Sequence, residues 1–208
     1  MGHDKKIGAD LAIIFDLGRV LVDIDFTRGL FKYYQGDIFE PERDIIERIF
    51  KDDLFVAFTT GKITPQEVYK ALTQKYNLLL EYDQFVQEWC DIFSPMDGME
   101  TLVQEIAARY PVGLLSDTDP LHWNYCLHTF PFLRIFNNPT LSYEIGVLKP
   151  NPVCYLTAAK NVNKHPQACL FIDDREDNVI GARRVGMRSF RFVGVAALKD
   201  ELSKMQVI

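Results

Sequence analysis

Acidic and polar side chains follow several apolar runs of this chain, at the point where each run stops. Asp16, Ser116 and the pair Asp173-Asp174 all stand in such positions. Short, nearly continuous apolar runs that end in a turn are typical of strands buried on both faces of a parallel sheet. Because the carboxyl ends of parallel strands share one edge, where ligands bind, these side chains are expected to converge. Lys149 precedes a helical pattern and could reach the same edge.

Together these groups predict a site for phosphoryl transfer. The carboxylates of Asp16, Asp173 and Asp174 would repel one another strongly at one edge unless a cation joined them. Mg²⁺ suits that position, because it takes oxygen ligands and keeps waters and substrate phosphate in its shell. Ser116 and Lys149 would supply donors to the phosphate. A carboxylate that faces the phosphate is a candidate nucleophile, as in enzymes that form an aspartyl-phosphate.

The elements that must position this chemistry alternate between strand and helix. Strands are expected at residues 11–15, 112–115, 169–172 and 189–193. Helical patterns lie between these runs, at residues 99–109, 152–162 and 177–185. This alternation favours an α/β fold with a parallel sheet.

The stretch from about Phe26 to Ser94 interrupts the alternation. It contains no convincing strand and is predicted to form several helices. The segment Thr64–Glu67 is a strong helix start, a capping box with proline at the first helical position. The aromatic side chains of the stretch are expected to form the core of a helical unit: Phe31, Tyr33, Tyr34, Phe50, Phe55, Phe58, Tyr69, Phe85 and Trp89.

Composition bounds the class of protein. The chain has 208 residues, of which 48% are apolar and 25% charged, which suits one domain or a domain with an insertion. The formal charge of −6 gives no basic footprint for nucleic acid, and no apolar run approaches membrane-spanning length. The first residues resemble neither a signal peptide nor an anchor, so a cytoplasmic protein is expected. A monomer or a homodimer is expected, and the sequence does not decide between them. The four cysteines form no metal-binding pattern and are predicted to be reduced and mostly buried: Cys90, Cys126, Cys154 and Cys169.

Four segments, in this order and spacing, resemble the motifs of the haloacid dehalogenase superfamily. They are Phe15–Asp23, Leu115-Ser116, Lys149-Pro150 and Phe171–Asp174. The resemblance spans nearly the whole chain. It implies an α/β, Rossmann-like three-layer core with a parallel sheet at residues 1–25 and 95–208, and an all-helical cap at residues 26–94. Within the superfamily, the segment from Asp16 to Phe26 looks most like the α-D-glucose-1-phosphate phosphatase group. That implies a Mg²⁺-dependent phosphatase of a small phosphorylated metabolite, such as a sugar phosphate.

The resemblance also implies a metal centre. Asp16 would be both the nucleophile and a metal ligand, and the carbonyl of Gly18 would be a second ligand. Asp174 would bind the metal directly, with Asp173 mainly behind it.

The phosphate would be held by a second set of groups in this resemblance. Ser116 and the amide of Asp117 would bind the transferring phosphoryl group, and Lys149 would neutralise its charge and that of Asp16. Asp177 would orient Lys149 or a metal-bound water.

Two positions depart from the family pattern. Most family phosphatases carry a second aspartate two residues after the nucleophile, which protonates the leaving oxygen and later activates water; here that residue is Gly18. Loss of a general acid typically costs about 10²–10⁴-fold in rate, so another group substitutes or the substrate has a good leaving group, such as a sugar 1-phosphate. Asp117 stands where the resembling group usually has asparagine. It is expected to cap the following helix, and the alternative is that it supplies the missing acid/base function.

Other functions stay open at this point. Gly18 raises the alternative of a catalytically weak homologue that binds a ligand or a protein partner. A metal-independent haloacid dehalogenase would leave Asp173-Asp174 unexplained, and a phosphomutase needs the acid/base that Gly18 lacks. A response-regulator receiver would carry its acidic pair at the first strand rather than after Lys149. A dinucleotide site lacks its G-x-G-x-x-G after the first strand.

Overall fold

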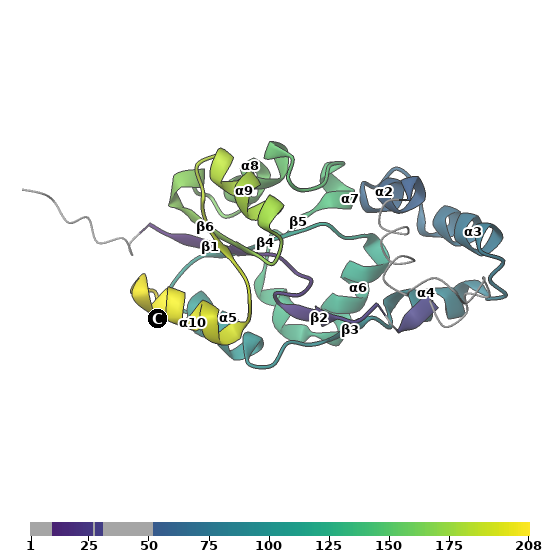
Figure 1. The fold of residues 1–208 in the computed structure, drawn as a ribbon, viewed down its shortest axis with the longest axis horizontal. Helices are drawn as coiled ribbons and strands as arrows, with labels where there is room; N and C mark the ends of the chain where they lie inside the picture. Colours follow the sequence, from purple (N-terminus) through teal and green to yellow (C-terminus); the bar gives the residue numbers. More distant parts are fainter. Residues whose placement is uncertain (1–9, 27, 31–51) are drawn as a thin grey trace, which may run out of the picture.

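A five-stranded parallel sheet lies at the centre of the computed structural model, which describes residues 10–26, 28–30 and 52–208. The strand order is β5-β4-β1-β6-β7 (Figure 1). The strands are β1 Ala12–Phe15, β4 Val112–Ser116, β5 Thr140–Leu141, β6 Cys169–Asp173 and β7 Arg188–Arg191. All their pairings are parallel, so the predicted α/β fold with a parallel sheet is confirmed. The two-residue edge strand β5 is too short to give a pattern in sequence.

Helices cover both faces of the sheet, which gives the expected three layers (Figure 1). One face carries α5 (Met99–Ala107), α6 (Pro120–Thr129), the 3-10 helix η2 (Pro131–Ile135) and α10 (Val195–Lys204). The other carries α8 (Pro152–Asn161) and α9 (Glu176–Arg184). Two further short pieces are α7 (Ser142–Ile145) and the 3-10 helix η3 (Pro166–Ala168).

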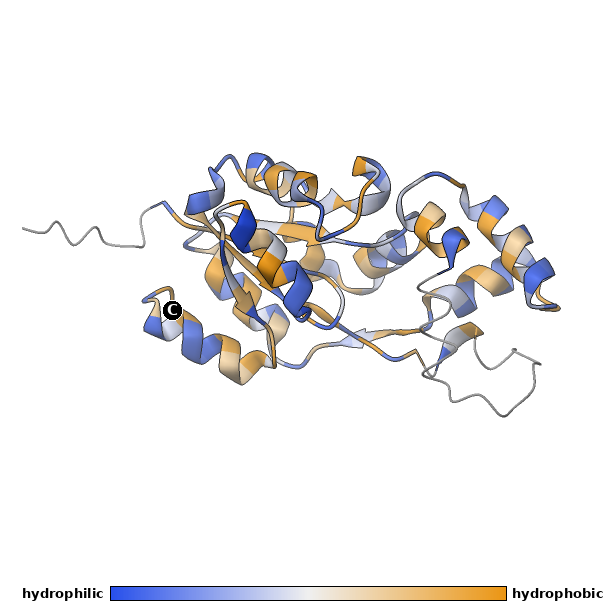
Figure 2. Cartoon of the chain, turned by 45° about the horizontal axis from the view of Figure 1, so that its top comes forward, coloured by the Kyte–Doolittle hydropathy of each residue, from blue (hydrophilic) through white to orange (hydrophobic). Residues whose placement is uncertain are grey.

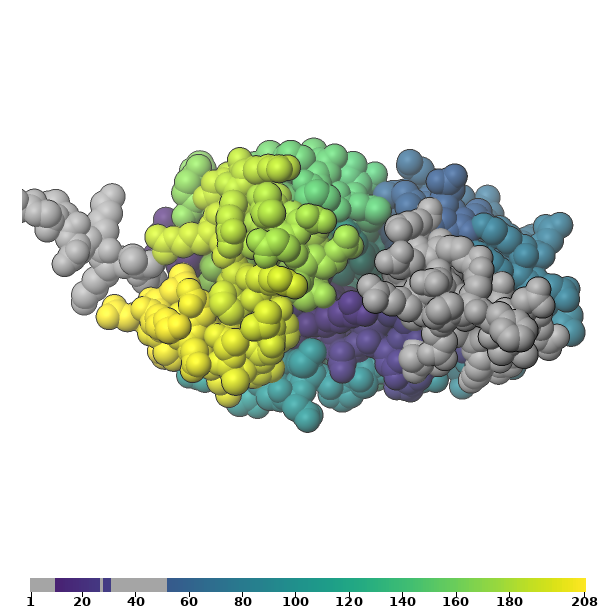
Figure 3. Space-filling view, viewed as in Figure 1, coloured from purple at the N-terminus to yellow at the C-terminus, as the bar shows by residue number. Residues whose placement is uncertain are grey.

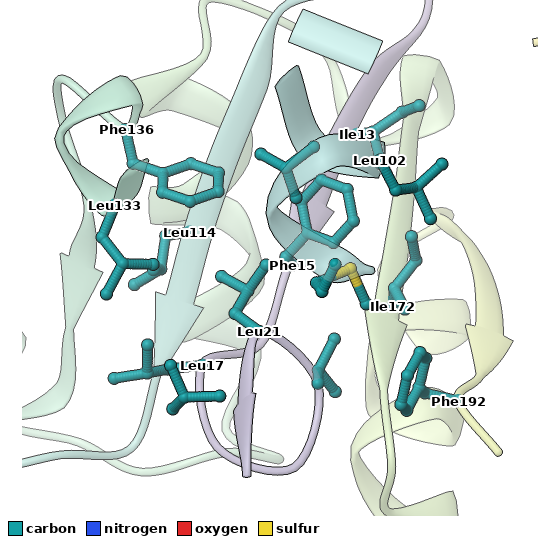
Figure 4. Packing of buried hydrophobic residues seen from close by; sticks show 14 of the residues in the cluster. Ile13, Phe15, Leu17, Leu21, Leu102, Leu114, Leu133, Phe136, Ile172 and Phe192 are labelled. Carbon is teal, nitrogen blue, oxygen red and sulfur yellow. The ribbon is translucent and has the colours of Figure 1, made fainter. Parts of the chain in front are cut away.

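The central strand β1 feeds both layers, because successive side chains of a strand point to opposite faces. Ile13 and Phe15 lie in the cluster on one side, and Ala12 and Ile14 in the cluster on the other. Figure 4 shows Phe15 among the apolar side chains of the first cluster, and its ring centroid lies 6.1 Å from that of Phe136. Figure 2 shows apolar and polar residues mixed along the covering helices, and their buried apolar side chains belong to the clusters on the two faces of the sheet. This burial fixes the strand ends from which the polar side chains project.

A short antiparallel ribbon connects the sheet to the inserted segment. Its strands are β2 (Val22–Ile24) and β3 (Phe93–Pro95). The expectation of no strand within residues 26–94 is therefore wrong at its end, since β3 begins at Phe93. Three-residue strands are too short to show an alternating pattern, which is why the sequence does not reveal them. The ribbon brings together the two points at which the chain leaves the core and returns to it. The domain boundaries predicted near these points, at residues 25/26 and 94/95, stay a prediction.

The inserted segment is helical where the structure describes it. Its helices are α2 (Asp53–Thr59), α3 (Pro65–Lys75) and α4 (Tyr82–Cys90), and α2 and α3 lie at one end of the molecule, with α2 beside α7 (Figures 1 and 3). The capping box is present: Thr64 Oγ1 accepts from the Glu67 amide, and Glu67 Oε2 accepts from the Thr64 amide at 2.7 Å. A separate apolar cluster includes Phe58, Phe85 and Trp89. Four of the predicted core aromatics lie outside the described residues: Phe31, Tyr33, Tyr34 and Phe50.

The start of α2 gives a test of how this helical unit is stabilised. Asp52 is the N-cap of α2, its carboxylate accepts from the Leu54 amide at 2.9 Å, and it also pairs with Lys75 of α3. Burial alone would raise the pKa of Asp52, but Lys75 and the Leu54 amide lower it. We expect Asp52→Ala to lower the free energy of unfolding by about 1 kcal/mol, measured by urea titration.

Asp52→Asn is the matched control, because it keeps a capping oxygen and loses the ion pair. A carboxyl with a lowered pKa stabilises the fold above the pKa of the unfolded chain. That contribution is lost as pH falls through the lowered pKa of the folded chain. The stability difference between wild type and Asp52→Asn should therefore shrink as the pH is lowered into this acid range. A difference that is constant with pH would show that the ion pair contributes nothing.

The predicted state of the cysteines is confirmed, since Cys90, Cys126, Cys154 and Cys169 are all free and buried. Within the part of the chain that the structure describes, no helix combines the length and the apolar character needed to cross a membrane.

Candidate active site

Three neighbouring strands bring the predicted polar side chains to one edge of the sheet. Asp16 follows β1, Ser116 ends β4 and Asp173 ends β6, with β1 between the other two. In the register of β1 and β6, Phe15 lies opposite Ile172, so Asp16 and Asp173 follow side by side. The Asp16 amide donates to the Ile172 carbonyl at 2.9 Å. All three polar residues are buried, so the expected convergence is present in the fold.

Lys149 contacts two of these carboxylates at once. Its Nζ lies 2.8 Å from Oδ1 of Asp16 and 2.7 Å from Oδ2 of Asp173. A third acceptor, the carbonyl oxygen of Leu115, lies at 3.4 Å. The Lys149 side chain is only 2% exposed, so water screens these contacts little. Lys149 is therefore an internal cation that links the ends of β1 and β6 to the loop before α8.

Asp173 is fully buried and accepts hydrogen bonds on both oxygens. Oδ1 accepts from the Arg175 amide at 2.8 Å, and Nδ2 of Asn178 lies 3.0 Å from each oxygen. Asp177 is exposed, and among the described contacts of Lys149 none is to Asp177, so the predicted orientation of Lys149 by Asp177 is not formed. The role of Asp177 toward a metal-bound water stays a prediction. Asn178 is a site residue that the sequence reasoning missed.

Asp174 completes a group of carboxylates that suits a divalent cation. One oxygen each from Asp16, Asp173 and Asp174 lies within 4.8 Å of the others. Ligands of an octahedral Mg²⁺ at about 2.1 Å stand roughly 3 to 4 Å apart, so this spacing needs little adjustment. With Asp117 nearby, carboxylates outnumber the ammonium of Lys149, which leaves negative charge for a cation to neutralise. The hard oxygen donors therefore fit Mg²⁺.

The charges of the site depend on one another. Burial raises the pKa of the Asp16 carboxyl well above its usual range; Lys149 opposes this rise and Asp173 adds to it. Burial and the neighbouring Asp173 also raise the pKa of Asp174. Burial would lower the pKa of Lys149, but Asp16 and Asp173 raise it above its ordinary value. A divalent cation between Asp16 and Asp174 would favour the ionised form of both.

Gly18 lies in the tight turn between β1 and β2. It forms an isolated bridge with Val22, and the Arg19 amide donates to the Val22 carbonyl at 2.7 Å. A Cβ added at Gly18 would run into Cδ1 of Ile24, the far end of a flexible side chain. The place where the family's second aspartate would begin is thus taken up by an apolar side chain from β2.

The side chain of Asp117 does not cap the following helix, contrary to expectation. Asp119 is the N-cap of α6, and its Oδ1 accepts from the amides of Leu121 and His122 at 2.9 and 3.0 Å. Oδ1 of Asp117 instead accepts from the Lys149 amide at 3.0 Å. Asp117 therefore ties the loop after β4 to the segment that carries Lys149.

The same loop after β4 also holds α2 of the helical unit. The Thr118 amide donates to Oγ of Ser142 at 2.9 Å. Ser142 Oγ lies 2.6 Å from the carbonyl oxygen of Thr59, at the end of α2, and 3.0 Å from that of Thr118. All three residues are buried. The loop that follows the phosphate-binding candidate Ser116 is thus fixed to the inserted segment.

Asp119 makes a second connection, to α4. Its Oδ2 accepts from Nε1 of Trp89 at 3.1 Å and lies 2.8 Å from Nδ1 of His122. Nε2 of His122 lies 2.9 Å from the carbonyl oxygen of Trp89, and the two rings stack with centroids 5.2 Å apart. His122 is a buried structural residue.

A cavity of about 640 Å³ opens elsewhere, along β3, α5 and η2. Its lining includes Ser94, Thr101 and Phe132 and contains none of the carboxylates described above. The chemistry of the side chains, rather than the volume of this cavity, locates the candidate active site.

Comparison with known proteins identifies the class. Residues 11–186 match the model of the haloacid dehalogenase-like hydrolases, and this match covers most of the chain. The protein therefore belongs to that family of hydrolases, and the family prediction is confirmed. The D-ribitol-5-phosphate phosphatase of Bacteroides thetaiotaomicron is 25% identical over 198 residues, 92% of this chain and 96% of the relative.

Solved structures share the fold. A haloacid dehalogenase family enzyme of Bacteroides thetaiotaomicron, in complex with magnesium and inorganic phosphate, has a TM-score of 0.77 at 24% identity, over 88% of this chain and 94% of that chain. The L-2-haloacid dehalogenase of Xanthobacter autotrophicus has a TM-score of 0.64 at 16% identity, over 96% of this chain and 85% of that chain. At these identities the likeness concerns the fold alone.

Proposed function

We propose that this hydrolase is a Mg²⁺-dependent phosphatase that removes phosphate from a small phosphorylated metabolite through an aspartyl-phosphate on Asp16. The observation that carries the proposal is the cluster of Asp16, Asp173 and Asp174 within 4.8 Å, closed by Lys149. The relative of 25% identity is named as a phosphatase, and the structural neighbour holds magnesium and phosphate, which supports the proposal.

In the proposed mechanism Asp16 is the nucleophile, and its neighbours hold and neutralise the phosphate. An oxygen of Asp16 attacks phosphorus in line with the departing ester oxygen, and the P–O bond to the substrate breaks as the bond to Asp16 forms. Ser116 and the amide of Asp117 donate to the transferring oxygens. Lys149 neutralises part of their charge and keeps Asp16 oriented. Water then attacks the phosphorus of the aspartyl-phosphate, which releases phosphate and restores Asp16.

A bound Mg²⁺, held by Asp16, Asp174 and the carbonyl of Gly18, would neutralise charge on the phosphate and hold it against the nucleophile. Asp173 would stand behind this set, because Lys149 and Asn178 already occupy its oxygens. A metal-independent dehalogenase has no use for such a carboxylate group, so the cluster favours the phosphatase.

We further propose a small sugar phosphate as the substrate. The relative named for D-ribitol 5-phosphate favours the phosphate of a sugar alcohol. The resemblance to the α-D-glucose-1-phosphate phosphatase group favours a hexose 1-phosphate, whose anomeric leaving group needs less protonation in a site with Gly18. The inserted helices would set this choice by covering the substrate and excluding water.

The test is a screen of phosphorylated metabolites with and without Mg²⁺, read as released phosphate. It should contain hexose 1-phosphates, sugar-alcohol 5-phosphates, flavin mononucleotide and p-nitrophenyl phosphate. Mg²⁺-dependent turnover of at least one sugar phosphate is expected. Absence of turnover on every ester would favour the catalytically weak homologue, and fluoride release from fluoroacetate without Mg²⁺ would favour a dehalogenase.

A further inference from the structure

We infer that Asp117 is the general acid and base of this site, in place of the aspartate that Gly18 replaces. The inference rests on the proposed phosphatase function. It begins from the Asp117 carboxyl, because the helix that Asp117 was expected to cap is capped by Asp119 and the contact to the Lys149 amide uses only Oδ1. Asp117 follows Ser116, which would hold the transferring phosphate. Like Asp174 it is half-buried, whereas Asp16, Asp173 and Lys149 are buried.

One hydrogen bond defines which oxygen of Asp117 carries the proton. Oδ1 accepts from the Lys149 amide at 3.0 Å, and an amide can only donate. In a protonated Asp117, Oδ1 is therefore the carbonyl oxygen and Oδ2 carries the O–H. The same contact fixes the carboxyl against the segment that carries Lys149, so Oδ2 is the oxygen left for a substrate or a water.

The surroundings of Asp117 shift the pKa of its carboxyl upward. The charged and titratable groups around it come from four places: Asp16 after β1, Lys149, Asp173 and Arg175 at the end of β6, and Cys154 and Tyr155 on α8. Burial raises the pKa of Asp117 above its ordinary value, and Lys149 opposes the rise. A carboxyl with a raised pKa holds its proton nearer to neutral pH, which suits a general acid.

Asp117 gives up a proton in the first step of the reaction and takes one back in the second. As Asp16 attacks phosphorus and the ester bond breaks, Oδ2–H of Asp117 gives its proton to the departing oxygen, which leaves as an alcohol. The Asp117 carboxylate then takes a proton from the water that attacks the aspartyl-phosphate. The P–O bond to Asp16 breaks, phosphate leaves, and Asp117 is protonated again.

This role predicts a loss that depends on the leaving group. Asp117→Asn keeps an oxygen that can accept from the Lys149 amide and removes the acid. With Mg²⁺, we expect kcat/KM for a sugar-alcohol phosphate to fall by about 10²-fold or more, and by less than about tenfold for p-nitrophenyl phosphate, whose leaving group needs no proton. The fall of kcat/KM at alkaline pH, which reports the acid of the free enzyme, should disappear in the variant.

Asp117→Ala removes both the acid and the contact to the Lys149 amide, whereas Asp117→Asn removes only the acid. Comparing the two variants therefore separates the acid/base role from a structural role. Equal losses on both esters in Asp117→Asn, or full activity on both, would overturn the inference. Failure of the wild type to turn over either ester with Mg²⁺ would instead overturn the proposed function itself.

Placing a carboxyl elsewhere in the site of the Asp117→Asn variant is a second test of the acid/base role. In the Asp117→Asn background, Gly18→Asp combined with Ile24→Ala places a carboxyl at the family position and removes the side chain that blocks it. Restored turnover of the sugar-alcohol phosphate is expected, and Gly18→Asn with Ile24→Ala is the matched control. If neither combination restores turnover while both keep p-nitrophenyl phosphate activity, an acid/base deficit in Asp117→Asn is contradicted.

Discussion

Asp16→Asn is expected to lower kcat for Mg²⁺-dependent phosphate release by about 10³-fold or more. The reason is that the amide is a poor nucleophile and a weaker metal ligand than the carboxylate. Asp16 is the proposed nucleophile, it belongs to the carboxylate cluster that would hold the cation, and it contacts Lys149. The measurement is phosphate release from the best substrate of the screen at saturating Mg²⁺. Acid quenching during turnover should also show phosphate bound covalently to wild type and absent from the variant.

The control for this variant is Asp200→Asn, the same change at an exposed position on α10. It should leave both turnover and the covalent phosphate unchanged. Turnover of Asp16→Asn within tenfold of wild type would remove Asp16 from the role of nucleophile.

Lys149→Met is expected to lower both stability and activity strongly. The variant keeps a side chain of similar length but leaves Asp16 and Asp173 buried without the ammonium that now lies 2.8 and 2.7 Å from them. Breaking a buried ion pair on one side typically costs about 3–5 kcal/mol. Turnover should fall by about 10²-fold or more, because a charge that stabilises the transferring phosphate is lost. Urea unfolding and phosphate release measure the two effects.

Adding Mg²⁺ tests whether repulsion between the carboxylates causes the instability of Lys149→Met. A divalent cation among the same carboxylates would offset part of their repulsion, so Mg²⁺ should raise the melting temperature of Lys149→Met more than that of wild type. Lys160→Met, at an exposed position on α8, is the matched control and should behave as wild type. A Lys149→Met protein as stable as wild type, without Mg²⁺, would show that the ammonium does not hold these carboxylates.

The convergence of the site was predictable because it follows from one property of parallel sheets. Apolar runs mark the strands, and their ends share an edge, so Asp16, Ser116 and Asp173 had to approach one another. Among the strands, the ones that the sequence did not reveal are the shortest. β2, β3 and β5 have two or three residues each, too few to show a period.

Two differences between expectation and structure at the site concern neighbouring residues. Asp117 was expected to cap α6, yet Pro120 stands at the first helical position, and this marks Asp119 as the cap. Asp177 was expected to orient Lys149 or a metal-bound water; it does not contact Lys149 among the described contacts, whereas its neighbour Asn178 faces the strand end and contacts Asp173. Adjacent residues of a helix point in directions about 100° apart, so a shift of one position in the start of α9 changes which side chain reaches the site.

The connection between the loop after β4 and the inserted helices could not be read from the sequence. Thr118 meets Thr59 through Ser142, and Asp119 meets Trp89. These contacts join residues far apart in the chain, and no local pattern specifies which helix of an insertion packs on which loop.

Titration of the protein with Mg²⁺ by calorimetry tests the shared cation site most directly, with wild type, Asp174→Asn and the control Asp200→Asn. The account predicts one Mg²⁺ bound per chain in wild type and Asp200→Asn, and affinity at least about tenfold weaker in Asp174→Asn. It would be contradicted by wild type that binds no Mg²⁺, or by Asp174→Asn that binds it as tightly as wild type.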